Sequence, residues 1–380
     1  MIVSVIGFGH VGSVIASVLA ENRCTVYGIE KNKNLISSFK KGLSPINEPG
    51  LQKLVTRGIE KKKLIITSSL ESISKSKVII ITVGTPLDKN YSPDLSQLKN
   101  TCFEIKKFIK SGQIICVKST IPPGTTRNLI YKILGKEKNI DLAFCPERFS
   151  EGTAIKEFKS LPMVVGGISE KATRKVSNFW LKVLNVKIIK VKNAETAEFV
   201  KLATNAWIDL NIGYVNDLAR LADQLNTNID ILDIVSASNT LKKGESFVNI
   251  LLPSIGVGGY CLTKDPWFVY SLGKKNNIDL QTIKAGRIAN DIMPRFTANK
   301  IYEYLDKKKI DYKNAKIAIL GLSFKSDSGD IRFTPVLPFI KDLIDNGIKN
   351  IKIYDPLVTK EDQKKIRIKT LKSSYEVIKE

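Results

Sequence analysis

Histidine is almost absent from the chain: His10 is the single one among 380 residues. Because imidazole is the usual proton carrier near neutral pH, any acid–base chemistry has to use lysine, aspartate, glutamate or water. Paired cysteines are missing as well, since none of the five cysteines has a C-x-x-C partner. Metal centres of the zinc type need such clusters of cysteine and histidine, so no bound metal is expected.

Long apolar runs are also missing, and none reaches the length needed to span a membrane. A strand-like run that begins at residue 2 leaves no room for the charged and apolar regions of a secretory signal. We therefore expect a cytoplasmic protein without a membrane partner. The length favours two or three domains, and 43% hydrophobic residues are enough for ordinary buried cores.

Acidic residues are few relative to basic ones: 37 against 60, which gives a formal net charge of +23. The lysines are spread along the whole chain, and no basic run is interleaved with aromatic residues that stack on bases. A nucleic-acid partner is therefore not expected. The positive charge instead helps to attract an anionic substrate such as a nucleotide diphosphate.

The N-terminal residues combine a strand, a glycine turn and a helix. The apolar run 2–6 is followed by Gly7-Phe8-Gly9-His10-Val11-Gly12 and then by a helical pattern from Ser13. This arrangement is typical of a dinucleotide-binding turn, in which glycines admit the pyrophosphate at a helix N-terminus. A second strand, 24–29, ends on Glu30, where a carboxylate binds the ribose diol. The carboxylate favours NAD over NADP, because a 2′-phosphate would meet a like charge.

Strand-like and helix-like segments alternate over about the first 180 residues, which predicts a parallel sheet covered by helices. Several of these strands end in short polar or glycine motifs at 83–86, 118–125 and 145–148. Each motif alone is also compatible with an ordinary turn. Because the carboxyl ends of parallel strands share one edge of the sheet, the motifs together predict a ligand site there.

The run 256–265 is a glycine-rich loop that carries Cys261, with Lys264 and Asp265 directly behind it. A thiolate is the reactive form of cysteine, and a nearby ammonium favours it, so the loop predicts covalent chemistry. The alternative is a flexible loop with an incidental cysteine. A long helical pattern, about 193–224, places Glu198, Lys201 and Asn205 on one stripe among apolar residues. That stripe is either a solvated face or a buried functional one.

A helical pattern over 294–305, a strand and turn at 316–322 and a strand at 351–356 predict a second, smaller α/β lobe. The expected fold is α/β, with two Rossmann-like doubly wound lobes joined by a central helical domain that contains a long helix. The expected domains are 1–185 for the dinucleotide, 190–295 for the helix and the cysteine loop, and 296–380 for the second lobe.

The chain resembles the UDP-glucose/GDP-mannose dehydrogenase family of nucleotide-sugar 6-dehydrogenases. The resemblance follows eight motifs in order, at 7–12, 48–50, 83–86, 119–125, 146–147, 198–205, 256–265 and 325–332. It implies oxidation of a sugar C6 alcohol to a carboxylate with two NAD, through a thiohemiacetal and a thioester on the cysteine. It also implies that the last lobe binds the nucleotide sugar, and this lobe is expected to be short, because relatives add strands and a helix beyond it.

The resemblance also implies roles for single residues. Cys261 is the nucleophile, Lys201 and Asn205 hold the C6 oxygen, Asp265 and Thr120 position water and protons, and Glu147 is the base for thioester hydrolysis. The expected cofactor contacts are Gly7, Phe8, Gly9, His10, Val11, Gly12, Glu30, Val83, Gly84, Thr85, Pro86, Ser119, Thr120, Glu147, Lys264 and Arg332. The expected substrate contacts are Arg148, Phe149, Ser150, Lys201, Asn205, Asn249, Ser254, Gly256, Gly258 and Lys325.

Three questions stay open at the level of the sequence. Arg148 resembles the branch of the family that acts on N-acetylated hexosamines such as UDP-N-acetylmannosamine, whereas Tyr260 and the run 150–152 resemble the UDP-glucose branch. The activity has two alternatives: a single-step 3-hydroxyacid-type dehydrogenase, and a non-catalytic protein that binds NAD or nucleotide sugars. The outer face of the long helix suggests a homodimer.

Overall fold

The computed structural model describes residues 1–135, 138–225 and 227–366, and the chain divides into two compact units, Met1–Ala203 and Thr204–Glu380. The first unit contains an eight-stranded sheet in the order β3-β2-β1-β4-β5-β6-β7-β8. Its strands are β1 (Ile2–Ile6), β2 (Thr25–Ile29), β3 (Leu64–Thr67), β4 (Val78–Ile81), β5 (Ile114–Val117), β6 (Asp141–Phe144), β7 (Met163–Gly167) and β8 (Ile188–Lys190). The strands predicted from the alternating pattern are confirmed.

Strands β1 to β6 are parallel, in the order 3-2-1-4-5-6 of a dinucleotide-binding fold, and β7 runs antiparallel to β6. The central strands are buried on both faces, which is why β4 reads as an unbroken run of β-branched residues. The strand order runs outward from β1 to β3 on one side and from β4 to β6 on the other. The switch point therefore lies between the paired strands β1 and β4. The glycine turn therefore lies at the place where such sheets bind ligands.

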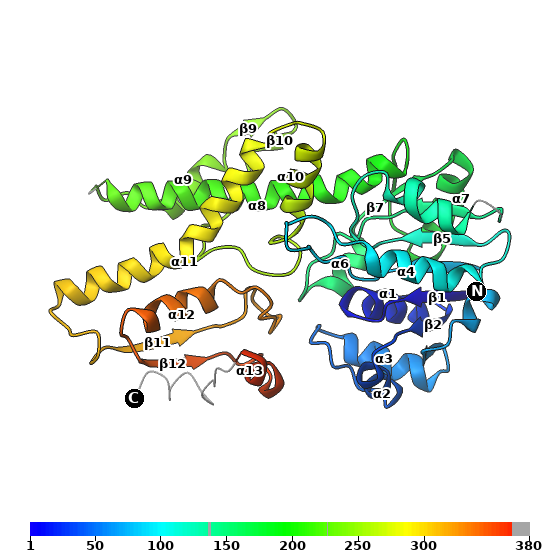
Figure 1. The fold of residues 1–380 in the computed structure, drawn as a ribbon, viewed down its shortest axis with the longest axis horizontal. Coiled ribbons are helices and arrows are strands. Elements are labelled where there is room, and N and C mark those ends of the chain that lie inside the picture. The colour runs from blue at the N-terminus through cyan, green and yellow to red at the C-terminus, as the bar shows by residue number, and fades with distance from the viewer. Residues whose placement is uncertain (136–137, 226, 367–380) are drawn as a thin grey trace. The chain divides into compact units, whose positions relative to one another are not determined.

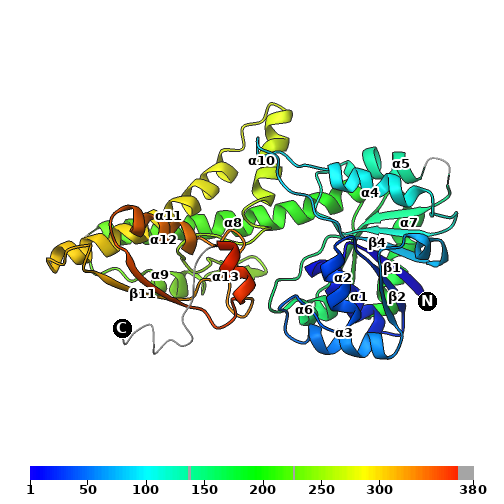
Figure 2. The same cartoon turned by 60° about the horizontal axis from the view of Figure 1, so that its bottom comes forward.

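Helices cover both faces of this sheet. They are α1 (His10–Glu21), α2 (Lys33–Lys40), α3 (Leu51–Glu60), α4 (Ser96–Lys106), α5 (Lys132–Leu134), α6 (Ala154–Ser160) and α7 (Glu170–Leu184), with a 3-10 segment η1 (Glu71–Lys75) and a π-helical segment η2 (Thr126–Tyr131). Side chains of α1, α3, α6 and α7 form one core with the strands, and those of α4, η2 and α5 form the other. The helices α1, α2 and α3 lie together beside β1 and β2 in Figures 1 and 2.

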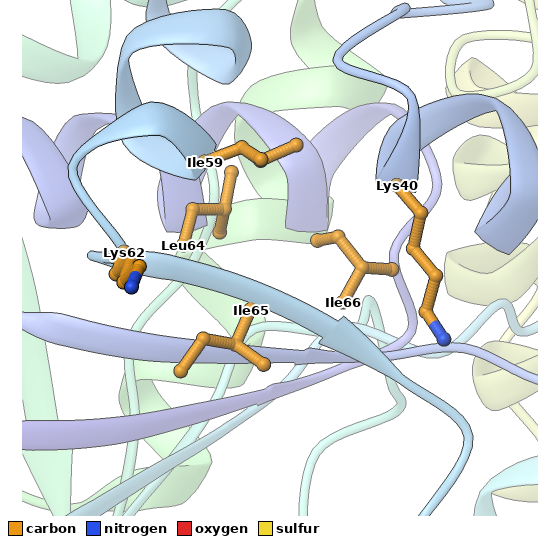
Figure 3. A pocket seen from close by; sticks show the side chains of 6 residues that line it. All are labelled: Lys40, Ile59, Lys62, Leu64, Ile65 and Ile66. Carbon is orange, nitrogen blue, oxygen red and sulfur yellow. The ribbon is translucent and has the colours of Figure 1, made fainter.

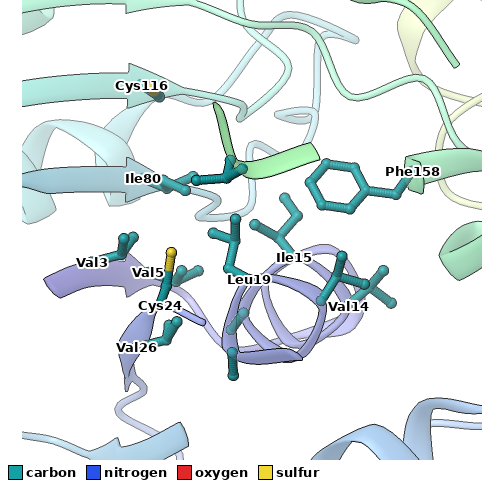
Figure 4. Packing of buried hydrophobic residues seen from close by; sticks show 14 of the residues in the cluster. Val3, Val5, Val14, Ile15, Leu19, Cys24, Val26, Ile80, Cys116 and Phe158 are labelled. Atoms are coloured by element: carbon teal, nitrogen blue, oxygen red, sulfur yellow. The ribbon is translucent and has the colours of Figure 1, made fainter. Parts of the chain in front are cut away.

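The first of these cores is drawn in Figure 4, where Ile15 and Leu19 of α1 face Val5 of β1 and Ile80 of β4. All four side chains have no solvent exposure. Complete burial of one such side chain contributes about 1.5–3 kcal/mol relative to leaving it exposed. The apolar spacing of α1 thereby fixes the helix against the sheet, and with it the position of the glycine turn between β1 and α1.

The second unit is mostly helical at its start. The long helix α8 (Ala194–Gln224) is continuous, as predicted, and it crosses from the first unit into the second. The remaining elements are α9 (Ile231–Ser238), a hairpin of β9 (Lys242–Lys243) and β10 (Ser246–Phe247), α10 (Asp265–Lys275), α11 (Gln281–Lys307), β11 (Lys316–Leu320), α12 (Val336–Asp345), β12 (Asn350–Tyr354) and α13 (Lys360–Ile366). Strands β11 and β12 pair in parallel, so the predicted second strand–turn–helix lobe is present.

Glycines allow α8 and α11 to touch. A Cβ added to Gly213 would lie 2.7 Å from the carbonyl oxygen of Gly286, and one added to Gly286 would lie 2.9 Å from Cα of Leu210. Such distances are shorter than real side chains permit, so this helix crossing requires glycine at both positions. Among the described residues, no helix has the length and apolar character needed to cross a membrane.

One helix differs from the sequence prediction. The pattern predicted a helix over 294–305, whereas α11 begins at Gln281 and contains Pro294 in its interior. Proline cannot donate to the carbonyl group four residues earlier, which belongs to Asn290. That carbonyl lies against Gly256, where an added Cβ would come within 2.9 Å. The Asn290 carbonyl, to which Pro294 cannot donate, therefore packs against the glycine loop at Gly256.

Candidate functional site

The glycine turn has the geometry that a pyrophosphate requires. Gly7 adopts a φ of +87°, which favours glycine, and a Cβ on Gly12 would lie 1.9 Å from the carbonyl oxygen of Gly7. A Cβ on Gly9 would meet nothing within 4 Å, so this position faces open space. The first turn of α1 carries no acidic residue and Gly9 makes no side-chain cap. The positive end of the helix is thus left available for an anion.

Glu30, at the end of β2, accepts hydrogen bonds from three backbone N–H groups. Its Oε2 accepts from Phe8 at 2.8 Å, and its Oε1 accepts from Lys31 and Asn32 at 2.8 and 3.0 Å. These bonds fix the carboxylate beside the glycine turn, and Oε2, which accepts one of them, keeps acceptor capacity for a hydroxyl group. The Nζ of Lys31 is bound to Glu104 at 2.7 Å. The arrangement fits the ribose diol of NAD.

His10 contacts Glu48, a residue of the 48–50 motif to which the sequence gave no role. The distance from Nε2 to Oε2 is 3.4 Å, and the same carboxylate accepts from the N–H groups of Gly152 and Ala154, both at 2.8 Å. Burial raises the pKa of Glu48, but the hydrogen bonds outweigh it and hold the pKa below its usual value. Glu48 therefore ties the start of α1 to the segment that follows Ser150.

The motifs after β4 and β5 are joined to each other. Ser119 donates from its hydroxyl to the carbonyl oxygen of Val83 at 2.7 Å, and Thr85 donates to the carbonyl oxygen of Thr120 at 2.6 Å. Gly84 and Pro86 belong to the first of these segments. The two loops thus form one bonded unit at the edge of the sheet, which positions Thr120.

After β6, the carboxylate of Glu147 is held by three donors. Oε1 accepts from the N–H groups of Arg148 and Phe149 at 2.8 and 3.2 Å, and Oε2 accepts from Nζ of Lys118 at 2.9 Å. The guanidinium of Arg148 donates to the carbonyl oxygen of Pro162. Ser150 is exposed, and its N–H donates to Glu157 at 2.7 Å. Sequence reasoning named Glu147 but not Lys118.

The stripe predicted on α8 is buried, so the interpretation as a solvated face was wrong. Glu198 has no exposed surface, Lys201 is 9% exposed and Asn205 is 6% exposed. Glu198 accepts from the N–H groups of Gly124 and Thr126 at 2.5 and 2.7 Å. Burial raises the pKa of Glu198 to about 7. This carboxylate connects the loop after Thr120 to the helix that carries Lys201.

In the second unit, Asp265 joins two of the other predicted catalytic and binding residues. Its Oδ2 accepts from Nδ2 of Asn205 and its Oδ1 accepts from Nζ of Lys264, each at 2.6 Å. Asp265 has no exposed surface and Lys264 is buried against the ring of Phe268, whose centroid lies 4.0 Å from Nζ. Cys261 is exposed, one turn before α10 begins at Asp265. An exposed thiol therefore stands beside a buried, fully bonded polar set.

The glycine loop packs on the segment 324–333. A Cβ on Gly258 would lie 2.4 Å from Cβ of Phe324, and the N–H of Gly259 donates to the carbonyl oxygen of Arg332 at 3.0 Å. The guanidinium of Arg332 lies 5.9 Å from the ring centroid of Tyr260. Lys325 lies at the start of this segment, where Ser328 donates to its carbonyl oxygen at 2.9 Å. The loop thus depends on glycine for its approach to the second lobe.

Asparagine side chains hold the predicted substrate cover. Asn211 donates to the carbonyl oxygen of Asn249 at 2.6 Å and accepts from the N–H of Leu251 at 2.9 Å. Asn216 accepts from the N–H of Ser254 at 2.8 Å. Asn211 and Asn216 are buried on α8, and asparagines in an apolar helical stretch were the signal in the sequence that could have pointed to them.

Asp355 repeats in the second lobe what Glu30 does in the first. It follows β12, and its Oδ2 accepts from Ser323 and Leu322 of the turn after β11, each N–H at 2.8 Å. Burial raises the pKa of Asp355, but hydrogen bonds from the N–H groups of the turn hold it below its usual value. In both lobes, a carboxylate after the second strand fixes the turn after the first.

A separate cavity of about 350 Å³ lies beside the edge strand β3. Figure 3 shows that its lining is mainly aliphatic, with Lys40 and Lys62 at its margin. The lining residues are Lys40, Ile59, Lys62, Leu64, Ile65 and Ile66. None of them belongs to the predicted site, so this cavity adds nothing to the cofactor or substrate contacts.

The first unit therefore collects the glycine turn, Glu30, the 83–86 segment, Thr120 and Glu147 at one edge of the sheet, and the second collects Asn205, the cysteine loop, Lys264 and Asp265. Such a turn with its ribose carboxylate defines the first unit as an NAD-binding unit of a dehydrogenase. The exposed cysteine beside the buried Asn–Asp–Lys set of the second unit fits the predicted nucleophile. The roles of the single residues stay predictions.

The chain belongs to the UDP-glucose/GDP-mannose dehydrogenase family. The family's NAD binding domain matches residues 1–183, its central domain matches 195–292, and its UDP binding domain matches 318–380. The predictions of the family, the α/β fold, the cofactor NAD and the class of enzyme are confirmed, and the chain is an NAD-dependent nucleotide-sugar 6-dehydrogenase. This membership decides against a single-step 3-hydroxyacid dehydrogenase.

Relatives cover nearly the whole chain. A UDP-N-acetyl-D-mannosamine dehydrogenase of Pyrococcus horikoshii is 34% identical over 94% of this chain and 84% of its own, and one of Methanococcus maripaludis is 35% identical over 93% and 79%. The solved structure of the Pyrococcus horikoshii UDP-D-ManNAc dehydrogenase has a TM-score of 0.86 at 33% identity, with 94% and 84% coverage. A UDP-glucose dehydrogenase of Pyrobaculum islandicum, 24% identical, shares the fold with a TM-score of 0.91 over 100% and 88%.

Proposed function

We propose that the chain oxidises the C6 hydroxymethyl group of a UDP-N-acetylhexosamine, with UDP-N-acetyl-D-mannosamine as the first candidate, to the uronic acid. The observation that carries the reaction is the exposed Cys261 beside the buried set of Asn205, Lys264 and Asp265. The choice of sugar is supported by relatives of 34% and 35% identity that are named for UDP-N-acetyl-D-mannosamine. The product is a precursor for polysaccharide biosynthesis.

The first part of the proposed mechanism concerns the C6 oxygen. Lys201 and Asn205 are one helical turn apart on α8, both buried, and both are donors. Donors that are fixed before the reaction stabilise an oxygen whose negative charge grows during it. Nδ2 of Asn205 is held by Asp265, so its orientation is set by the fold. Lys201 and Asn205 therefore hold the oxygen as the alcohol becomes an aldehyde.

The second part uses Cys261. The glycine turn and Glu30 would hold two NAD molecules in succession, and each would supply the acceptor for one hydride from C6, while water takes up the hydroxyl proton of each oxidation. Between these oxidations the sulfur of Cys261 bonds to the aldehyde carbon and forms a thiohemiacetal, and the second oxidation converts it to a thioester. The covalent bond prevents loss of the half-oxidised sugar. Thr120 and Asp265 position the water and protons that the later steps need.

The third part is hydrolysis of the thioester. The water oxygen bonds to the carbonyl carbon, Glu147 takes a proton from the water, and the C–S bond breaks with its electron pair on the sulfur of Cys261. Glu147 keeps a fixed orientation through the N–H groups of Arg148 and Phe149. A glutamate suits this step in a chain whose single histidine lies in the glycine turn.

The proposal is tested by the amount of NADH released per sugar consumed, with purified protein, excess NAD and five sugars: UDP-N-acetylmannosamine, UDP-N-acetylglucosamine, UDP-N-acetylgalactosamine, UDP-glucose and GDP-mannose. We expect two NADH per UDP-N-acetylmannosamine. Two NADH with UDP-glucose alone would overturn the sugar assignment and leave the four-electron reaction intact. One NADH per sugar would contradict the thioester mechanism.

UDP-glucose is the second candidate. Tyr260 packs beside the ring of Phe333, with centroids 6.2 Å apart, and precedes the cysteine as in the UDP-glucose branch that the sequence resembles. The residues 150–152 point to the same branch. The panel of sugars distinguishes the two candidates directly.

The three domains 1–185, 190–295 and 296–380 stay a proposal. It is supported by the family matches over 1–183 and 195–292, which end or begin near the first limits, and by the match over 318–380, which lies within the third domain. A cytoplasmic location is proposed as well. It is supported by the five cysteines, all of which lie in the described residues and form no disulfide, as is usual in a reducing compartment.

A homodimer through the outer face of α8 is also part of the proposal. Trp207, Tyr214 and Leu221 follow at intervals of seven residues along this helix, and all three are exposed. A large apolar stripe with this spacing is typical of a helix that packs on a partner helix. Trp207 and Tyr214 are also of the residue types that most often form the energetic centres of interfaces.

Trp207→Asp is expected to raise the dissociation constant of the dimer by at least about 30-fold, because a charge replaces a central aromatic contact. Sedimentation velocity over a range of concentrations measures it. Phe103→Asp is the matched control, since Phe103 is similarly exposed but lies on α4. Equal effects of both substitutions, or none from Trp207→Asp, would place the interface elsewhere.

A further inference from the structure

Lys118 follows β5, and its side chain is completely buried. Its Nζ lies 2.9 Å from Oε2 of Glu147, and the other groups around it are weak partners for a cation. The sulfur of Met163 is 3.6 Å from Nζ, and the ring centroids of Trp180 and Phe158 lie at 5.0 and 5.5 Å. Glu147 is thus the carboxylate that pairs with this ammonium.

A buried ammonium is costly for the fold unless it is paired and hydrogen-bonded. A second ion pair, at the start of β6, shows the contrast. Nζ of Lys175 binds Asp141 at 2.5 Å, but the Lys175 side chain is 41% exposed. Asp141 begins β6, and Glu147 follows the end of β6. A lysine whose only role is to neutralise a carboxylate can stay partly exposed, as Lys175 does. Lys118 is instead enclosed by aromatic side chains.

The enclosure restricts where Oε2 of Glu147 can lie. Two backbone N–H groups fix Oε1, and the single ammonium fixes Oε2, so the plane of the carboxylate is determined from both sides. Phe158 and Trp180 keep Nζ itself from moving, because they pack edge to face with centroids 5.9 Å apart. Without Lys118, only the Oε1 side would stay fixed.

We propose that Lys118 is a positioning residue for hydrolysis of the thioester: it fixes Glu147 in the orientation from which the carboxylate takes a proton from water. The inference rests on the proposed function, in which Glu147 is the hydrolytic base. Lys118 acts through Glu147 alone and is not part of either oxidation.

Lys118→Met tests this step, because methionine keeps much of the length of the side chain and removes the charge. The hydride-transfer burst of a single turnover, followed as NADH, should stay within about twofold of the wild-type rate. Steady-state turnover should fall by about tenfold or more, because part of the roughly 10²–10⁴-fold contribution of a general base is lost. Mass spectrometry of quenched protein should show the sugar bound to Cys261. Equal slowing of burst and turnover, or no slowing, would overturn the proposal.

The decisive comparison is a double-mutant cycle with Glu147→Gln. The variant Lys118→Met/Glu147→Gln leaves no buried charge unpaired at this place, so it avoids the main risk to folding. Its thioester should persist as long as in Glu147→Gln alone, within about twofold, because Lys118 has no effect without the base. A further lengthening of about tenfold would show a role independent of Glu147 and overturn the proposal.

Two single variants complete the set. Lys118→Arg keeps a cation and should retain more turnover than Lys118→Met, although the guanidinium is bulkier. Lys175→Met breaks the ion pair at the other end of β6 and should leave the ratio of burst to turnover unchanged. The outcomes separate the two proposals: a wild-type protein without two NADH per sugar refutes the proposed function, whereas normal thioester hydrolysis in Lys118→Met refutes only the role of Lys118.

Discussion

Serine in place of Cys261 is expected to abolish uronate formation, with kcat lowered by at least about 10³-fold. The serine hydroxyl is not ionised at neutral pH, and the single histidine of the chain, His10, belongs to the glycine turn that is assigned to the cofactor. Without a thiohemiacetal, the second oxidation has no substrate. The measurement is uronate formed and NADH released with the sugar that the wild-type protein accepts.

Binding of NAD should be unchanged in this variant, because the substitution leaves the glycine turn and Glu30 intact and Cys261 is not among the expected cofactor contacts. Cys102→Ser is the matched control. Burial raises the pKa of Cys102 to about 12, so its thiol is protonated and unreactive at neutral pH. That control should release the same NADH per sugar as the wild type. Uronate formation at the wild-type rate by Cys261→Ser would eliminate the covalent mechanism.

Local spacing was sufficient to predict the elements that depend on local rules. The strand–glycine–helix unit at the N-terminus and the carboxylate at the end of the next strand follow from steric requirements of a tight turn, and the structure has both, with Gly7 at positive φ and Glu30 bonded to Phe8. The continuity of α8 likewise follows from a long pattern without proline. These features need few contacts between distant residues.

The features that could not be predicted from the sequence depend on tertiary contacts. Lys118 reads in the sequence as an ordinary lysine after a strand, and only the packing of Trp180 and Phe158 makes it a buried partner of Glu147. Pro294 was interpreted as a helix start, because the approach of Gly256 to the Asn290 carbonyl cannot be read from local spacing. In both cases, residues far apart in the chain decide the local structure.

The same argument applies to the substrate cover. Sequence motifs indicated Asn249 and Ser254, but the side chains that hold this segment, Asn211 and Asn216, lie on α8. Asn216 also donates to Asn290 of α11 at 2.9 Å, so the side chain of α8 that holds the cover is itself fixed by a second helix. Buried asparagines of this kind are usually fully bonded, and their partners are visible only in the fold.

Lys201→Ala is expected to lower kcat by about 10²–10³-fold with little change in KM, because a donor that acts on growing negative charge contributes mainly in the transition state. The reason lies in its place on α8: the side chain is 9% exposed, between the buried Glu198 and Asn205 on the same stripe. Steady-state rates of NADH formation over a range of sugar concentrations give both constants.

Lys192→Ala is the matched control, since Lys192 is exposed and lies just before α8 begins at Ala194. It removes the same charge near the same helix, so it separates the position of Lys201 from the general attraction of a basic protein for an anionic substrate. An effect of Lys201→Ala confined to KM would make Lys201 a binding residue. Asn205, whose orientation Asp265 fixes at 2.6 Å, would then be the donor on which stabilisation of the C6 oxygen depends.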